Sequence, residues 1–299
     1  MENPNIDEVM KKAGILVEAL PYIRRFKGSV FVVKYGGAFM DDPNPQVRSS
    51  VALDIAFLAA VGIRVVIVHG GGKAISRAME KAGLKPVFKN GMRLTDEKTV
   101  SIVENVLNGD VNAEIAEMLA ANGCEPFRIK GNEVLKCEKL FSRGENGEEI
   151  DIGYVGNPCG VNTAPIRAAI SHALTPVVSP IAVGADGHAY NTNADVAAAA
   201  VAAALGARRL VFLCDVPGLM RDPKDRSTLI SHLKVDEVEG LKKAGIIGGG
   251  MTPKVDSGVK ALRSGVRRVH FIDGYMPHSL LLEIFTDSGI GTEIVSVEK

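Results

Sequence analysis

The chain has 299 residues, which is enough to bury a substantial core as one large domain or as two fused lobes. Its 35 lysines and arginines balance its 35 aspartates and glutamates, so the formal net charge is zero and no overall basic surface for nucleic acid is expected. No apolar run reaches the roughly 18 residues of a membrane-spanning helix.

The N-terminus and the cysteines indicate a cytoplasmic protein. The first residues lack the apolar core of a signal peptide, so we do not expect secretion. Cys124, Cys137, Cys159 and Cys214 show no CxxC spacing, which favours buried thiols in a reducing compartment. The six histidines form no HxxxH or HExxH motif, so we expect no transition-metal site built by the protein.

The first predicted element is a helix from Asn5 to Phe26, in which apolar residues recur at helical spacing. Pro21 lies inside this pattern and predicts a kink or break near Leu20. From Ser29 onward, short apolar strands alternate with helices. The predicted strands are 29–34, 65–68, 127–129, 177–181, 210–214 and 269–272, and the predicted helices include 46–60, 96–107, 111–121, 164–173, 196–205, 236–244 and 254–263.

This alternation predicts the fold class. Strands that are apolar on both faces and separated by helices are typical of an α/β protein with an open, mostly parallel sheet sandwiched by helices. We expect an N-terminal kinked helix (residues 1–28), a first lobe (29–187) and a second lobe (188–299), with the boundary in the stretch GADGHAYN. The Asn-Gly pairs in KNGMRL and RGENGEE predict hairpin turns.

Glycine clusters follow three of the predicted strands, at Gly36-Gly37, at Gly70–Gly72 and at Gly218. Ligands of open parallel sheets bind outside the carboxyl ends of the strands, where glycine amides and helix N-termini attract anions. The Rossmann and Walker A patterns both fail at HGGG, and the lipase-type oxyanion hole lacks its GxSxG partner. Taken alone, the glycines leave two readings open: a phosphate cradle or a tight strand-to-helix turn.

Two lysines favour the phosphate cradle. Lys34 ends an apolar strand, where a charge is costly unless it faces an anion. Lys254 lies in the first turn of a predicted helix, where the helix dipole disfavours a cation. Asn191, Asn193 and Asp195 gather at the start of an alanine-rich helix. Two cations, a glycine cradle and one aspartate are typical of phosphoryl transfer, which needs positioning and charge neutralisation.

Six motifs carry a family resemblance: VVKYGG, VIVHGGG, KNGMRLT, YNTNAD, LCDVPGL and GGMTPKV. In this order, over essentially the whole chain, they resemble the amino-acid kinase family and, within it, the N-acetylglutamate kinases of arginine biosynthesis. The resemblance implies ATP-dependent phosphorylation of the γ-carboxylate of N-acetyl-L-glutamate. The first lobe would bind this acceptor and make a dimer contact, and the second lobe would bind ATP.

Site roles follow from the resemblance. Lys34 and Lys254 would flank the transferring phosphoryl group, and Asp195 would hold the two lysines. Because the γ-carboxylate is itself the nucleophile, no catalytic base is needed. Magnesium would be held mainly by the ATP phosphates. The resemblance assigns substrate contacts to Gly71, Gly72, Arg93, Asn191 and Asn193, and ATP contacts to Gly36, Gly37, Asp215 and Gly218.

The first helix and the C-terminal stretch resemble the arginine-inhibited subgroup of that family. This resemblance implies a hexamer, a trimer of dimers joined by interlaced N-terminal helices, and makes a PII-type signalling protein a candidate partner. Its inhibitor-site candidates are Tyr22, His278, Glu283 and Gly289. A helix and tail that only pack against the protein remain the alternative.

Two other functions stay open at the level of the sequence. One is a kinase of the same family that acts on glutamate, carbamate, aspartate or UMP. The other is a non-catalytic regulator that binds arginine or a nucleotide, although the presence of Lys34, Lys254 and Asp195 argues against it.

Overall fold

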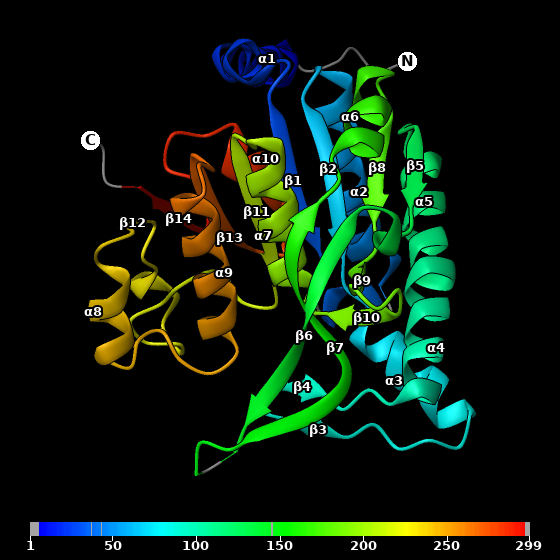
Figure 1. The fold of residues 1–299 in the computed structure, drawn as a ribbon. Helices are drawn as coiled ribbons and strands as arrows, with labels where there is room; N and C mark the ends of the chain where they lie inside the picture. Colours follow the sequence, from blue (N-terminus) through cyan, green and yellow to red (C-terminus); the bar gives the residue numbers. More distant parts are fainter. Residues whose placement is uncertain (1–5, 37, 43, 145, 297–299) are drawn as a thin grey trace.

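The computed structural model describes residues 6–36, 38–42, 44–144 and 146–296, and an eight-stranded twisted sheet forms its centre (Figure 1). Every neighbouring pair in this sheet is parallel except β13–β14, which confirms the predicted fold class. In spatial order the strands are β12 (His232–Lys234), β14 (Thr292–Val295), β13 (Arg268–Asp273), β11 (Arg209–Cys214), β1 (Val30–Tyr35), β2 (Arg64–His69), β8 (Thr175–Val178) and β5 (Pro126–Ile129).

Helices cover both faces of the sheet, because its strands are apolar on both sides. On β1, Phe31 and Val33 pack in the same core as Ile55, whereas Val32 packs in the opposite core with Ala198. One layer contains α2 (Pro45–Ala60), α3 (Gly72–Lys81), α5 (Asn112–Ala121) and α10 (Ser279–Ile284); the other contains α6 (Ala164–Ser171), α7 (Ala194–Leu205) and α9 (Met251–Arg263). The remaining helices are α4 (Glu97–Asn105), α8 (Val238–Lys243), a π-helical turn η2 (Val106–Val111) and the 3-10 turns η1 (Ala38–Asp41), η3 (Gly131–Glu133) and η4 (Arg226–Thr228).

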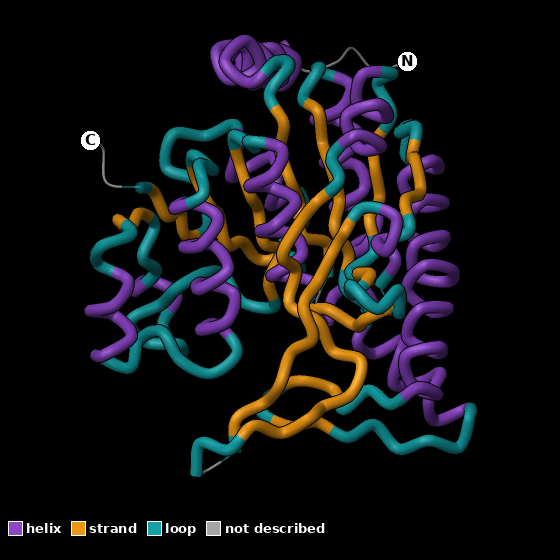
Figure 2. The backbone as a smooth tube through the Cα atoms, in the orientation of Figure 1, coloured by secondary structure: helices purple, strands orange, loops and turns teal. Residues whose placement is uncertain are grey.

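A second, closed arrangement of four strands was not predicted. It consists of β6 (Leu135–Arg143), β7 (Glu149–Val161), β9 (Ile181–Val183) and β10 (Ala189–Thr192). The long β6–β7 ribbon runs away from the central sheet, toward the short β3–β4 hairpin (Figure 2). That hairpin, β3 (Phe88–Lys89) and β4 (Met92–Arg93), turns at Asn90 and Gly91, both at positive φ, as the Asn-Gly pair predicts.

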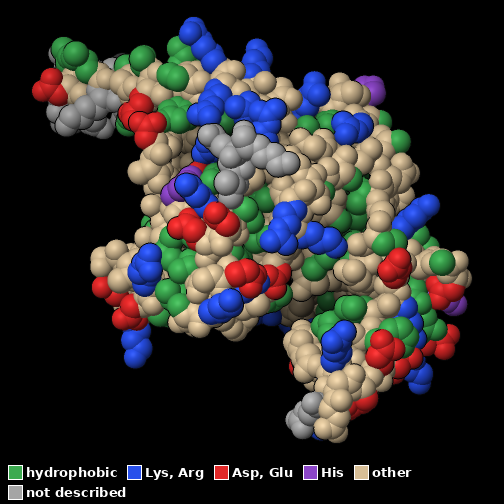
Figure 3. All heavy atoms as spheres, turned by 60° about the vertical axis from the view of Figure 1, so that its left-hand side comes forward, with side chains coloured by type: hydrophobic (Ala, Val, Ile, Leu, Met, Phe, Trp, Pro, Cys, Tyr) green, Lys and Arg blue, Asp and Glu red, His purple; other side chains and the backbone are tan. Residues whose placement is uncertain are grey.

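The N-terminal helix, α1 (Ile6–Phe26), continues through Pro21 without a break, and Asn5, where the prediction begins the helix, lies outside the described residues. The helix projects from the body of the protein and exposes a set of large apolar side chains (Figure 3). These are Ile6, Met10, Ile15, Leu16, Val17 and Leu20. Nowhere in the described part of the chain is a helix both long enough and apolar enough to cross a membrane.

The two proposed lobes share the central sheet. β1, from residues 29–187, pairs directly with β11, from residues 188–299, over four aligned residues. The predicted boundary stretch, residues 184–191, forms the turn between β9 and β10 and most of β10 itself. The carboxyl ends of β1 and β11 therefore meet at the junction of the two lobes.

Candidate active site

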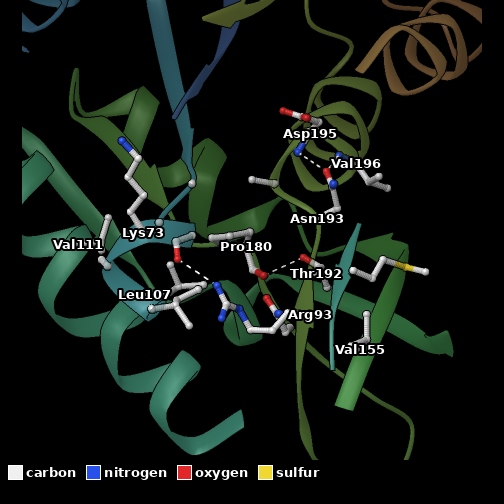
Figure 4. Close-up of a pocket in the computed structure, with 18 of the residues that line it drawn as sticks. Lys73, Arg93, Leu107, Val111, Val155, Pro180, Thr192, Asn193, Asp195 and Val196 are labelled. Carbon is white, nitrogen blue, oxygen red and sulfur yellow. Dashed lines mark hydrogen bonds between the residues drawn. The ribbon is translucent and has the colours of Figure 1, made fainter. Parts of the chain in front are cut away.

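A cavity of about 470 Å³ lies at the carboxyl ends of β1, β2 and β11 (Figure 4). Of the three glycine positions that the sequence singled out, Gly70–Gly72 line it directly. Its lining includes Lys34, Gly70–Gly72, Arg93, Asn191, Asn193, Asp195 and Asp215.

Asp195 bridges the two lysines that the sequence predicted to lie together. Lys34 Nζ lies 3.1 Å from Asp195 Oδ1, and Lys254 Nζ lies 2.8 Å from Asp195 Oδ2. Lys34 also donates a hydrogen bond of 3.0 Å to the Gly36 carbonyl. The three side chains come from β1, α9 and α7, so two cations and one carboxylate from distant parts of the chain meet beside the cavity.

The charge states of this cluster follow from burial and proximity. Burial lowers the pKa of Lys34, although the Asp195 carboxylate opposes this change. Burial acts in the same direction on Lys254, but Asp195 outweighs it and the pKa of Lys254 is raised. Burial alone would raise the pKa of Asp195; the two lysines reverse that effect and lower it. The cluster thus holds a net positive charge next to the cavity, suited to a polyanionic ligand.

The glycine loops approach each other closely. A Cβ at Gly36 would lie 2.9 Å from Gly70 N, and a Cβ at Gly71 would lie 2.5 Å from Leu107 Cδ2. Neither position has room for a side chain. Gly72 has no atom within 4 Å of an added Cβ, so it faces open space at the cavity. Gly37 lies outside the described residues.

Arg93 reaches this loop from the β3–β4 hairpin. Its guanidinium donates to the Gly72 carbonyl at 3.0 Å and to Ser76 Oγ at 2.9 Å, and it lies over the ring of Phe88 at 4.6 Å. The side chain is buried, and burial lowers its pKa. Arg93 is therefore a buried cation on the wall of the cavity (Figure 4).

The other predicted contacts have different environments. The Asn193 side chain caps α7, accepting from Asp195 N at 2.8 Å and from Val196 N at 3.2 Å, and so fixes the helix turn that carries Asp195. Asn191 and Asp215 line the cavity. Gly218 has φ of 155°, and a Cβ there would lie 2.6 Å from Thr292 Oγ1. Gly218 does not line the cavity, and packing against Thr292 is a sufficient reason for a glycine at this position.

A second cavity, of about 280 Å³, lies between α1 and the C-terminal strands. Three of the four predicted inhibitor-site residues, Tyr22, Glu283 and Gly289, line it. Its charged lining is mixed and consists of Arg25, Arg209, Arg268, Glu283, Asp287 and Glu293. A cavity lined by both cations and carboxylates suits a zwitterionic ligand.

His278 is not in this second cavity. Its Nδ1 lies 2.7 Å from Asp54 Oδ1, on the α2 side of α10, so the structure does not bring His278 together with the other three. His270 lies there in its place, with Nδ1 2.6 Å from Glu283 Oε1. The sequence offered one signal for it, a histidine inside the apolar strand that became β13. Glu283 also accepts from the amides of Ile290 and Gly291, at 2.7 and 2.9 Å.

Metal ligands are sparse. Across the described residues, no group of three or more histidine, cysteine, aspartate or glutamate side chains is arranged to hold a metal ion. Both oxygens of Asp195, a buried carboxylate that lines the central cavity, are already paired with lysines.

The comparisons with known proteins agree with this geometry. The chain is 46% identical to the acetylglutamate kinase of Archaeoglobus fulgidus over 290 residues, which cover 95% of this chain and 99% of that protein. The N-acetylglutamate synthase of Neisseria gonorrhoeae, complexed with coenzyme A and N-acetyl-glutamate, superposes with a TM-score of 0.82 and 28% identity over 96% of this chain. The same synthase complexed with coenzyme A and L-arginine superposes with a TM-score of 0.77 and 28% identity over 95% of this chain. This chain spans 64% and 65% of those two synthase chains.

The model of the amino acid kinase family matches residues 29–273. This span contains β1 with Lys34, the glycine loops, Asp195 on α7, and Lys254 on α9. Both the matched length and the residues gathered at the sheet edge lead to one conclusion: the chain belongs to the amino acid kinase family.

Proposed function

We propose that the protein transfers the γ-phosphoryl group of ATP to the γ-carboxylate of N-acetyl-L-glutamate, a step of arginine biosynthesis. The observation that carries this proposal is the Lys34–Asp195–Lys254 cluster beside the glycine loops. The 46% identity to an acetylglutamate kinase over nearly its full length supports the choice of acceptor.

In this proposal Lys34 and Lys254 neutralise the charge of the transferring phosphoryl group, and Asp195 keeps the two ammonium groups apart and in place. The amides of Gly36, Gly71 and Gly72 donate to phosphate and carboxylate oxygens. The acceptor carboxylate attacks the γ-phosphorus, the bond to the β–γ bridging oxygen breaks, and ADP leaves with that oxygen's negative charge. No proton needs to be removed from the nucleophile.

Arg93 is our candidate for the α-carboxylate of the acceptor, helped by Asn191. A guanidinium can bind a carboxylate through two parallel hydrogen bonds, and Arg93 is already held in place by Gly72 and Ser76. Gly37, Asp215 and Gly218 stay predictions for the ATP side. We further propose that magnesium arrives bound to ATP phosphates, whose charge it would neutralise, since the Asp195 carboxylate is occupied by the lysines.

The test is an ADP-release assay with ATP, magnesium and N-acetyl-L-glutamate, in which hydroxylamine traps the acyl phosphate as a hydroxamate. We expect hydroxamate with N-acetylglutamate and not with glutamate, carbamate or aspartate. Lys34→Ala and Lys254→Ala should each lower kcat by about 100-fold or more. Lys139→Ala, which removes a surface ion pair with Asp151, serves as the control.

Each outcome has a definite meaning. Parental turnover in both lysine variants would refute their catalytic roles. Phosphorylation of another acceptor, UMP included, would move the protein to another branch of the family. ATP or arginine binding without any phosphorylation would make it a regulator.

Feedback inhibition by arginine is the second proposal, and the cavity of mixed charge beside α1 supports it. Arginine carries one carboxylate and two cations, which match the cationic and acidic side chains of that lining. Glu283→Gln should weaken inhibition at least tenfold with kcat unchanged, an effect expected for one charged hydrogen bond. Glu239→Gln, at an exposed site on α8, is the control. Equal inhibition of both variants would refute the assignment of Glu283.

The exposed apolar residues of α1 support a homo-oligomer joined through this helix. A trimer of dimers, as in the subgroup that the sequence resembles, would bury them. Light scattering of the full chain and of a variant lacking residues 1–26 tests this proposal. We expect a hexameric mass for the full chain and a dimeric mass for the deletion; equal masses would refute it. Binding of a PII-type regulator stays a prediction.

A further inference from the structure

The peptide between Gly70 and Gly71 is held in a fixed orientation. The Gly70 amide donates to the Tyr35 carbonyl at 2.8 Å, and the Gly70 carbonyl lies 2.8 Å from His69 Nδ1. A trans peptide is planar, so its N–H points away from its C=O. With the carbonyl turned toward His69, the Gly71 N–H points in the opposite direction. Among the described residues this N–H has no hydrogen-bond acceptor, and Gly71 lines the central cavity.

A second side chain fixes the tautomer of His69. The Nδ2 group of Asn112 lies 3.2 Å from His69 Nε2 and 2.9 Å from the Val177 carbonyl, and Asn112 Oδ1 accepts from Arg128 Nε at 3.0 Å. An amide nitrogen can only donate, so Nε2 must accept. The proton therefore lies on Nδ1, which donates to the Gly70 carbonyl. Both His69 and Asn112 are buried, and burial lowers the pKa of His69 to about 4, which keeps the ring neutral at physiological pH.

The segment that carries Asn112 also contacts Gly71 directly. The π-helical turn η2 ends at Val111, one residue before Asn112, and its Leu107 fills the space where a Gly71 side chain would lie. Arg128 donates to the carbonyls of Asn108 and Gly109 within this turn. One helical segment thus orients His69 and packs against the loop that His69 holds.

From these contacts we infer that His69 is a positioning residue, which aims the Gly71 N–H at the phosphoryl or carboxylate oxygen in the central cavity. It acts through the Gly70–Gly71 peptide and touches no substrate. This inference rests on the proposed phosphoryl transfer. It differs from a packing role for a buried histidine, because it requires a donor at the Nδ1 position specifically.

Three substitutions separate these two roles. The Nδ2 of His69→Asn can occupy the Nδ1 position and keep the donor, whereas His69→Gln places its amide near the Nε2 position and His69→Leu has no donor. We expect His69→Asn to keep kcat within about tenfold of the parental value, and the other two to lose about 100-fold, the usual effect of one transition-state donor. KM for ATP should change little in all three, because the lost contact acts mainly in the transition state.

Melting temperatures measured alongside show whether folding explains the losses. If kcat falls in proportion to the melting temperature across the three variants, and His69→Asn has no higher kcat than His69→Leu, then His69 only packs and the inference fails. Nitrogen-15 NMR of the parental protein provides a test independent of variants and of turnover. We expect a protonated Nδ1 and an unprotonated Nε2 for His69. The ring signals of His69 are assigned as those that disappear in His69→Asn. The opposite tautomer overturns the inference. If the parental enzyme shows no kinase activity, the proposed function is refuted, and the NMR experiment still tests the orientation of His69.

Discussion

Replacing Asp195 by asparagine would remove the negative charge that holds the buried Lys34, 3.1 Å away, and the partly buried Lys254, 2.8 Å away. Losing one partner of a buried ion pair costs about 3–5 kcal/mol, because the other charge stays buried without compensation. The asparagine has nearly the same shape, so packing changes little. Most of the cost therefore falls on the protonated form of Lys34, whose pKa burial already lowers.

The same free energy can be expressed as a pKa change. The lost attraction stabilised only the ammonium form of Lys34, so its removal lowers the pKa of Lys34 further. If phosphoryl transfer needs the ammonium form, the alkaline limb of the kcat profile must move to lower pH in Asp195→Asn. We also expect kcat at its optimum to fall by about 100-fold or more, because both lysines lose their common anchor.

The assay is the pH dependence of kcat between about pH 6 and 10, with thermal melts of both proteins extended down to about pH 2. The carboxyl of Asp195 has a lowered pKa, so its contribution to stability is present above its ordinary pKa and is lost as pH falls through the folded value. The stability difference between parent and variant should narrow in acid. Asp151→Asn, at an exposed ion pair, is the control and should change neither property. An unmoved alkaline limb would refute the reasoning.

Three further predictions concern single positions. Arg93→Lys should raise KM for N-acetylglutamate by at least about tenfold and leave KM for ATP unchanged, because a lysine cannot bind a carboxylate through two hydrogen bonds; equal changes in both values would contradict the acceptor role. Gly71→Ala should destabilise the protein by about 1–3 kcal/mol in denaturant unfolding, because its Cβ would lie 2.5 Å from Leu107 Cδ2, and adding Leu107→Ala should recover part of the loss. Gly206→Ala should cost about 1 kcal/mol, since this C-cap of α7 has φ of 64°; Gly240→Ala, inside α8, should not destabilise and serves as its control.

The sequence predicted six of the eight strands of the central sheet, because most of these six are apolar on both faces, and it missed the edge strand β12 and its neighbour β14. A run such as residues 65–68 has few alternatives to a buried strand, and it lies inside β2. The closed arrangement of β6, β7, β9 and β10 was missed for the opposite reason. β6 mixes charged and apolar residues, and the closed arrangement also needs its pairing with β9, a strand far along the chain that local patterns do not report.

The site likewise combines features that local sequence patterns predict with features that only the tertiary structure determines. The lysines were predictable because a charge at the end of an apolar strand or in the first turn of a helix conflicts with local energetics. Their meeting at Asp195 depends on the order of strands in the sheet, which the residues alone did not reveal. His278 and His270 illustrate the limit: both are polar residues near the C-terminal end, and only the packing of β13 against α10 decides which one faces Glu283.

The hydrogen-bonded seam between β1 and β11 bears on how this protein could be divided or evolved. A cut at the predicted lobe boundary would leave each fragment with an unpaired, apolar strand edge, of the kind that templates aggregation. The two fragments should therefore be obtained in soluble form only when they are co-expressed, because each fragment covers the exposed strand edge of the other. Neither half of this fold is therefore expected to serve as an independently folding module.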